Sequence, residues 1–217
     1  MQRTAFASAA LVMLAWWCAS GLTQGFQVWT AEGARRLEVA QSPAATPMAW
    51  LLGDGLSGES LYSVLARPGR VTIVSFIYTR CPTVCLALGS SFAQLQAAIA
   101  DGAGAQAGKE DIQLLSISFD PAHDDASQLS RYAALWRADA RHWRLATVPD
   151  PDALRRLLKA WQVLVIDNGQ GGYDHNAALL VVDQHGRLVR IFNEDDGATA
   201  LAFARGLQQA SRPRALV

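Results

Sequence analysis

The chain has 217 residues, of which 51% are hydrophobic and 18% charged, so it can form one ordinary globular domain with segments to spare. Nineteen basic residues balance nineteen acidic ones. Because neither sign of charge dominates, nothing in the composition predicts binding to nucleic acid or to a strongly acidic partner.

The N-terminal stretch "AFASAALVMLAWWCASGL", residues 5–22, contains no charged residue and follows Arg3. This layout is typical of a signal peptide or of a single membrane-spanning helix. The stretch exceeds a signal core of roughly 7–15 residues and offers a poor cleavage site in "CASG". We therefore expect residues 1–25 to anchor the protein in a bacterial inner membrane as one uncleaved helix. A buried soluble helix is the alternative, and the terminal position disfavours it.

Residues 26–49 contain two arginines, two prolines and many small residues without sustained periodicity. They predict a membrane-proximal stalk, followed by a folded domain at residues 50–212 in the periplasm. Thiols in that compartment meet oxidants. Because Cys18 lies in the anchor, Cys81 and Cys85 are the only cysteines of the exported part.

The domain contains strand-like runs that alternate with helical patterns. The expected strands are 71–78, 112–119, 143–148, 177–183 and 187–193, and the expected helices start near Pro82, carry residues 129–136, start at Pro151 and span 198–210. The last two strands are joined by "QHG" and predict a hairpin. This order predicts an α/β, thioredoxin-like fold, in which a mixed sheet is covered by helices on both faces.

The two cysteines lie in "TRCPTVC", residues 79–85, directly after the first strand. Residues four apart face the same side of a helix, and a helix N-terminus favours thiolate over thiol. Plain core packing, a disulfide, a redox couple and half of a metal site are the alternatives. A disulfide would close a very short loop and add little stability, so we favour a working role for Cys81 and Cys85.

A metal site needs a third donor, and the chain has four histidines. Those in solvated or arginine-flanked settings are His123, His142 and His185. His175 differs, because it ends a glycine-bearing loop (168–173) and immediately precedes an apolar strand. Such a loop can reach the strand-to-helix turn across the edge of the sheet. We therefore predict His175 as the third ligand, with Asp174 beside it to orient the ring.

Three motifs in order resemble the Sco/SenC family of copper-binding cytochrome c oxidase assembly proteins. They are "FIYTRCPTVC", "SISFDPAHDD" and "YDHNAALLVVDQHGRL", and the likeness runs from Leu51 to Gln209. The chain is identified as a member of that family on these motifs, which together are far more specific than the cysteine spacing alone.

The resemblance implies that Cys81, Cys85 and His175 bind one copper ion, as Cu(I) or Cu(II). It implies that Asp174 and Asp120 support these ligands, and it matches Asp124 to the family's acidic loop. The implied function is a membrane-anchored copper chaperone that helps to assemble the dinuclear copper site of cytochrome c oxidase. The implied partner is subunit II of that oxidase or another exported copper protein.

Two departures from the family pattern are Leu86, where a proline usually follows the second cysteine, and Asn176, where a small hydroxyl residue is common. The alternative function is a thiol–disulfide oxidoreductase in which Cys81 and Cys85 react and keep the thiols of a copper protein reduced. A peroxidase on the same fold and a structural zinc site are weaker alternatives, since zinc usually takes four protein ligands.

Overall fold

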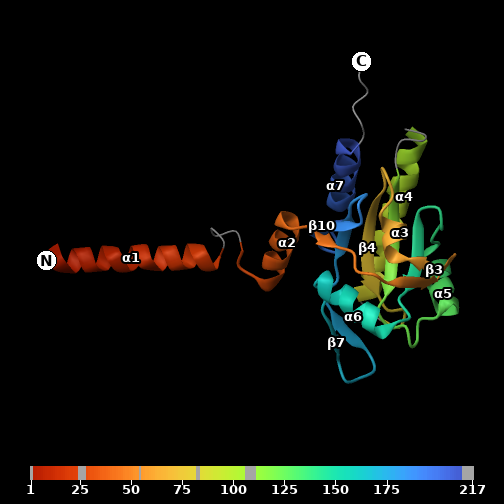
Figure 1. Cartoon of the computed structure of the whole chain (residues 1–217), viewed down its shortest axis with the longest axis horizontal. Helices are drawn as coiled ribbons and strands as arrows, with labels where there is room; N and C mark the ends of the chain where they lie inside the picture. The colour runs from red at the N-terminus through yellow and green to blue at the C-terminus, as the bar shows by residue number, and fades with distance from the viewer. Residues whose placement is uncertain (1, 24–27, 54, 82–83, 106–110, 212–217) are drawn as a thin grey trace, which may run out of the picture.

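The computed structural model describes residues 2–23, 28–53, 55–81, 84–105 and 111–211. Its helices are α1 (Gln2–Leu22), α2 (Ala31–Gln41), α3 (Leu61–Leu65), α4 (Val84–Ala105), α5 (Ala126–Trp136), α6 (Pro151–Ala160) and α7 (Gly197–Ala210). Its strands are β1 (Ala44–Ala45), β2 (Trp50–Gly53), β3 (Leu56–Ser60), β4 (Val71–Ile77), β5 (Ile112–Ser118), β6 (Trp143–Thr147), β7 (Val165–Asp167), β8 (Tyr173–His175), β9 (Leu179–Val182) and β10 (Arg187–Phe192). Figure 1 shows α1 extending away from a domain built around one central sheet.

The central sheet has eight strands in the order β1-β10-β9-β4-β5-β6-β2-β3. Strand β4 is parallel to β5 and antiparallel to β9, and β5 is parallel to β6. Every residue of β4 is buried, as its β-branched and aromatic run predicts for a strand covered on both faces. A separate two-stranded sheet pairs β7 with β8.

Helices cover both faces of the sheet. The strand register places Trp143 and Phe76 on opposite faces. Phe92 of α4 contacts Trp143, with ring centroids 5.4 Å apart, and Trp161 at the end of α6 contacts Phe76 at 6.0 Å. The stripe predicted for α4 is buried along its whole length and comprises Leu88, Phe92, Leu95 and Ile99. The mixed α/β arrangement predicted from the sequence is therefore confirmed.

The segment for which we predicted a stalk contains regular structure packed on the domain. Thr30 caps α2, and Glu32 pairs with Arg35 and Arg36 along the helix. The Arg35 side chain is only 6% exposed and donates a hydrogen bond to the carbonyl oxygen of Trp161 at 3.3 Å. Strand β1 pairs with β10 at the edge of the sheet. The charged residues of this segment, which predicted a linker, instead pair with one another along α2. The bond from Arg35 to Trp161 then holds α2 against the domain.

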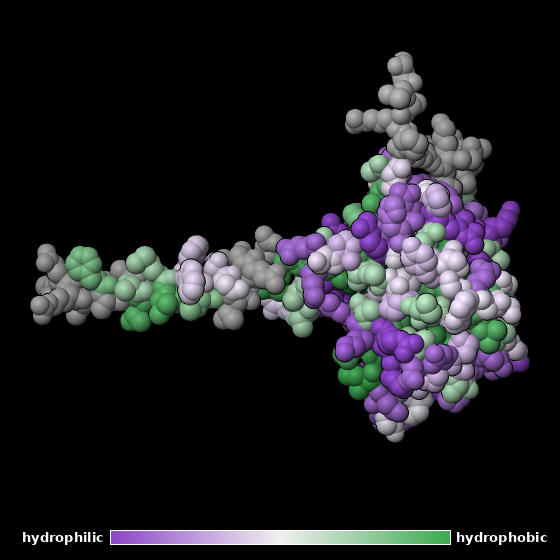
Figure 2. Space-filling model, in the orientation of Figure 1, coloured by the Kyte–Doolittle hydropathy of each residue, from purple (hydrophilic) through white to green (hydrophobic). Residues whose placement is uncertain are grey.

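The N-terminal helix α1 has exposed apolar side chains, including Leu11, Val12 and Trp17. Figure 2 shows hydrophobic surface along α1, which extends away from the domain. Among the residues that the structure describes, however, no helix is both long and apolar enough to cross a membrane. The membrane-spanning helix predicted within residues 1–25 is therefore not supported.

Candidate functional site

The predicted site lies at the edge of the sheet where the parallel strands β4 and β5 end. Cys81 follows β4 by a short turn, and its backbone N–H donates to the carbonyl oxygen of Tyr78 at 3.3 Å. The residue is only 8% exposed. Phe119 leaves β5 at the same edge, where its N–H donates to the carbonyl oxygen of Ile77 at 3.0 Å. The structure thus places Cys81 at the strand-to-helix turn that the sequence predicts.

Cys85 is the second residue of α4, which begins at Val84. Its side chain lies outside the described part of the structure, as do residues 82 and 83, so the predicted proximity of the two sulfur atoms stays a prediction. Leu86 follows in the first turn of α4 and is 45% exposed. Backbone N–H groups in a first turn have no partner within the helix, so a proline here would remove no helical hydrogen bond. Leucine and the family's proline are therefore both compatible with the backbone hydrogen bonding of α4 at this position.

Asp124 fastens the cysteine turn to the end of β5. Its side chain is completely buried and accepts hydrogen bonds from the backbone N–H of Thr79 at 2.9 Å and from the Thr79 hydroxyl at 2.5 Å. The hydroxyl of Ser118, the last residue of β5, donates a third hydrogen bond to the same carboxylate. Thr79 lies two residues before Cys81, so Asp124 fixes the backbone that carries the first cysteine.

Asp120 is also buried, 3% exposed, and binds the residue next to Cys81. Its carboxylate accepts from an Nη of Arg80 at 2.9 Å and contacts Nδ1 of His123 at 2.8 Å. The hydrogen bond that Arg80 donates to Asp120 raises the pKa of Arg80. His123 is half exposed, as predicted, but it is held by Asp120 rather than left in solvent. Within the described residues, Asp120 supports the turn through Arg80.

His175 ends β8 and lies against aromatic rings that come from both strand ends. Its ring centroid is 5.1 Å from that of Phe119 and 6.4 Å from that of Tyr78. Tyr173, two residues earlier, contacts the same two rings at 5.6 and 5.3 Å. Burial lowers the pKa of His175, and the charge of Asp174 opposes this shift. The neutral imidazole, which is the form that ligates metals, is therefore favoured.

Asp174 lies on the other face of the β7–β8 hairpin. It alternates with His175 along β8 and pairs in register with Ile166, and both Asp174 and Ile166 are exposed. The only effect of Asp174 on His175 that the described residues show is electrostatic: its charge raises the pKa of His175. Its role in orienting the imidazole stays a prediction.

Asn176 fastens the chain directly after His175. Its Oδ1 accepts from the backbone N–H of Leu164 at 2.7 Å, and its Nδ2 donates to the carbonyl oxygen of Gln162 at 3.2 Å. The N–H of Asn176 donates to the carbonyl oxygen of Leu164 at 3.3 Å. These bonds tie the residue after His175 to the chain that leads into β7. A small hydroxyl side chain could not span both partners, so the departure at Asn176 has a structural purpose.

Tyr78 connects the two halves of the site. Its hydroxyl lies 3.2 Å from the backbone nitrogen and 3.4 Å from the carbonyl oxygen of Tyr173, and its carbonyl accepts from Cys81. One residue thus bonds to both the cysteine turn and the histidine hairpin. Sequence reasoning had used Tyr78 only as the end of a strand; its position directly before the turn was the available signal.

The described side chains contain no group of three or more histidine, cysteine or acidic residues close enough to hold a metal ion. The predicted ligand set includes Cys85, whose side chain is outside that part, so the set is not tested as a whole. The register places two of the three histidines that we had set aside at the opposite ends of the strands: His142 precedes β6, and His185 joins β9 to β10.

A mixed α/β sheet with a buried cysteine after β4 and a histidine held against the same strand end fits the thioredoxin-like class. A sequence model of the SCO1/SenC family matches residues 63–208, which is more than half of the chain. The chain therefore belongs to the SCO1/SenC family.

Known proteins agree with this membership. The SCO1 protein homolog of Bacillus subtilis is 25% identical over 179 residues, covering 80% of this chain and 86% of that protein. Two solved structures share the fold. ScoI of Bradyrhizobium japonicum with copper bound has a TM-score of 0.59 at 22% identity, covering 76% of this chain and 99% of its own. BsSco, described as a member of the Sco family of cytochrome c oxidase assembly proteins with a disulfide switch, has a TM-score of 0.63 at 19% identity, with coverages of 77% and 95%.

Proposed function

We propose that this protein binds one copper ion through Cys81, Cys85 and His175 and passes it to an exported copper protein, with subunit II of cytochrome c oxidase as the expected recipient. The observation that carries the proposal is the link through Tyr78, which bonds to the Cys81 turn and to the His175 hairpin at one edge of the sheet. Two thiolates and one imidazole suit Cu(I) and also hold Cu(II).

The residues around these donors fit a copper cargo. Cys81 is buried in the hydrophobic cluster that also contains Tyr78 and Phe119, and soft, weakly hydrated ions prefer such surroundings. Asp124 and Asp120 hold the turn through hydrogen bonds from Thr79 and Arg80, respectively. The related ScoI of Bradyrhizobium japonicum contains copper, which supports the same cargo here.

A second candidate is a thiol–disulfide oxidoreductase, favoured by the disulfide switch described for BsSco. Cys81 and Cys85 would give up two electrons and two protons, forming one disulfide while the disulfide of a target protein is reduced to two thiols. This activity needs no histidine. The packing of His175 against the same strand end as Cys81 therefore favours copper binding as the principal role.

We also propose that the domain works in the bacterial periplasm and that α1 associates with the inner membrane. The support is the row of exposed apolar side chains on α1, among them Phe6, Leu14 and Trp16. Apolar surface of this kind is stabilised when it leaves water. Fractionation of cells that produce the intact chain tests this: recovery in the soluble periplasmic fraction would contradict the proposal.

Titration of the reduced full-length protein with Cu(I), in competition with a chromophoric chelator, tests copper binding. We expect a one-to-one complex that is lost in Cys81→Ser and Cys85→Ser and weakened in His175→Ala. Cys18→Ser and His142→Ala are matched controls, because both residues lie away from the site, and neither should alter the affinity. A complex that survives both serine replacements would refute the ligand set, and unchanged reductase activity in His175→Ala without copper would favour the second candidate.

A further inference from the structure

The outer edge of β10 is only half covered. Strand β1 pairs with β10 at Arg187 and Leu188, and the register of β10 shifts between Leu188 and Arg190. Beyond this shift, residues 190–192 pair with β9 on one side, and no described strand pairs with them on the other. Alternate residues of such an edge direct their backbone N–H and C=O groups outward, and unpaired edges readily accept another strand.

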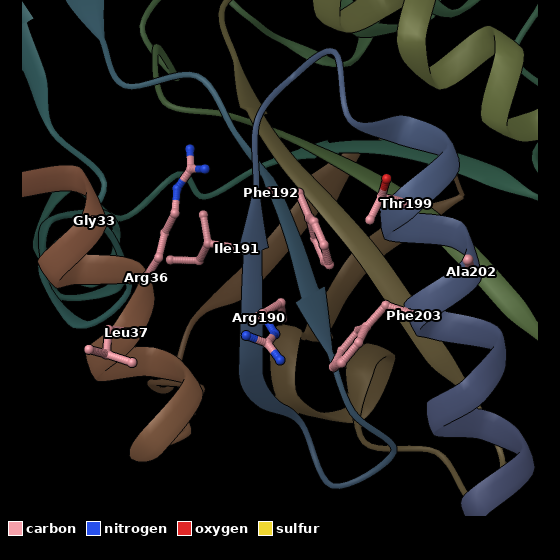
Figure 3. A pocket seen from close by; sticks show the side chains of 9 residues that line it. All are labelled: Gly33, Arg36, Leu37, Arg190, Ile191, Phe192, Thr199, Ala202 and Phe203. Atoms are coloured by element: carbon pink, nitrogen blue, oxygen red, sulfur yellow. The ribbon is translucent and has the colours of Figure 1, made fainter. Parts of the chain in front are cut away.

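This open edge forms the floor of a groove of about 550 Å³ between α2 and α7 (Figure 3). Leu37 of α2 lies on one side of it, and Phe203 of α7 lies on the other. The register directs Ile191 to one face of the sheet and Phe192 to the face that carries α7, where its ring centroid is 5.7 Å from that of Phe203. An extended segment lying along the edge would therefore find apolar side chains on both sides.

The groove has a positive charge that is free to bind an anion. The guanidinium of Arg190 lies over the Phe203 ring, 5.1 Å from its centroid, and the residue is exposed. Within the described residues, no carboxylate pairs with it. Arg36 also lines the groove but is bound to Glu32 and Asn193. Among the described residues that line the groove, none is acidic, so the charge of Arg190 is not compensated by them.

We propose that the edge of β10 between α2 and α7 is a docking site for an extended, acidic segment of a partner protein. The segment adds as a short strand along residues 190–192, and an acidic side chain pairs with Arg190. Backbone hydrogen bonds supply affinity in this kind of recognition, and side-chain pockets supply specificity. A second copy of the chain fits less well, because two β10 edges paired with each other would bring two Arg190 cations together.

Peptide binding to the full-length protein tests the proposal. The probes are Ac-Val-Glu-Val-Glu-Val-NH2, labelled for fluorescence anisotropy, and its counterpart with lysine in place of glutamate. We expect the glutamate peptide to bind and to slow amide hydrogen exchange of alternate residues in 190–192, and the lysine peptide to bind about fivefold more weakly or not at all. Arg190→Glu should reverse this preference, whereas Arg156→Glu on exposed α6 surface should leave it unchanged.

Two results would overturn the proposal: equal binding of both peptides, or protection of the β10 amides that is unaffected by Arg190→Glu. Dimerisation without peptide, with the same amides protected, would assign the edge to a second copy instead. Phe203→Ala should weaken binding of the glutamate peptide, but the variant should still prefer the glutamate peptide to the lysine peptide. The His175→Ala variant should bind the peptide normally, because none of the residues lining the groove is a proposed copper ligand. Peptide docking at β10 therefore stands or falls independently of copper binding.

Discussion

Replacing Asp124 with alanine removes the carboxylate that holds the cysteine turn against β5. Three donors lose their acceptor: the N–H and hydroxyl of Thr79 and the hydroxyl of Ser118. A hydrogen bond to a charged group contributes about 1.5–3 kcal/mol, and bonds that share one acceptor do not add fully. Since Asp124 is completely buried, we expect the free energy of unfolding to fall by about 3–5 kcal/mol.

Urea denaturation followed by tryptophan fluorescence measures this loss, and the Cu(I) titration measures its effect on the site. Because Thr79 lies two residues before Cys81, the affinity for Cu(I) should fall about 10–100-fold. Asp125→Ala is the control. The carboxylate of Asp125, the residue next to Asp124, only caps α5 by accepting from the N–H of Gln128. Its loss should lower the free energy of unfolding by about 1 kcal/mol and leave copper binding unchanged.

Asp124→Asn separates charge from volume, since the amide keeps one acceptor but brings its own donors toward Thr79 and Ser118. We expect its stability to lie between those of the wild type and Asp124→Ala. The role of Asp124 in holding the turn is refuted if Asp124→Ala is within about 1 kcal/mol of the wild type in its free energy of unfolding, or if it is strongly destabilised yet binds Cu(I) with the original affinity.

Three further outcomes are expected. Asn176→Ala should speed hydrogen exchange of the Leu164 amide and weaken Cu(I) binding about tenfold, while urea stability falls by only about 1–2 kcal/mol; unchanged exchange would show that the side chain fastens nothing. Leu86→Pro should unfold within about 1 kcal/mol of the wild type and still bind copper, as monitored by circular dichroism and titration. Arg141 lowers the pKa of Asp139 from 3.8 to about 2. The ionised pair therefore stabilises the fold above pH 3.8, and this contribution is lost as the pH falls through about 2. In acid denaturation, Asp139→Asn and Arg141→Gln should each reduce the loss of stability over that pH range.

The sequence predicted the central strands and the buried stripe of α4, because uninterrupted β-branched runs and 3.6-residue periodicity report burial directly. It did not predict α2, because the helix is short and its burial involves Arg35, a residue type that is seldom buried. Its stability depends on the carbonyl of Trp161, more than one hundred residues away. No local pattern contains such a partner.

The same contrast holds at the site. Cys81 and His175 were predicted as ligands because thiolates and imidazoles are common metal ligands. In the structure the backbone of Cys81 bonds to Tyr78, and the ring of His175 lies near the ring of Tyr78. Asp124 was noticed only through resemblance, since nothing local distinguishes it from its exposed neighbour Asp125. The backbone bonds of Asn176 were not predicted, because their partners lie in the chain before β7, and the role of Asp174 stays a prediction, with its carboxylate on the other face of β8 from the imidazole.

The two halves of the site have unequal resistance to local opening. Cys81 follows β4, the central strand of an eight-stranded sheet, whereas His175 belongs to a two-stranded sheet of its own. Small outlying units open at lower free energy than a sheet core, so we expect the hairpin to open before β4 and β5 separate. A cargo ion held by both halves would therefore lose its imidazole first and its cysteine-turn contacts last. If copper is held as proposed, this order of opening would expose the ion on the side of the hairpin, and an acceptor protein would approach from there.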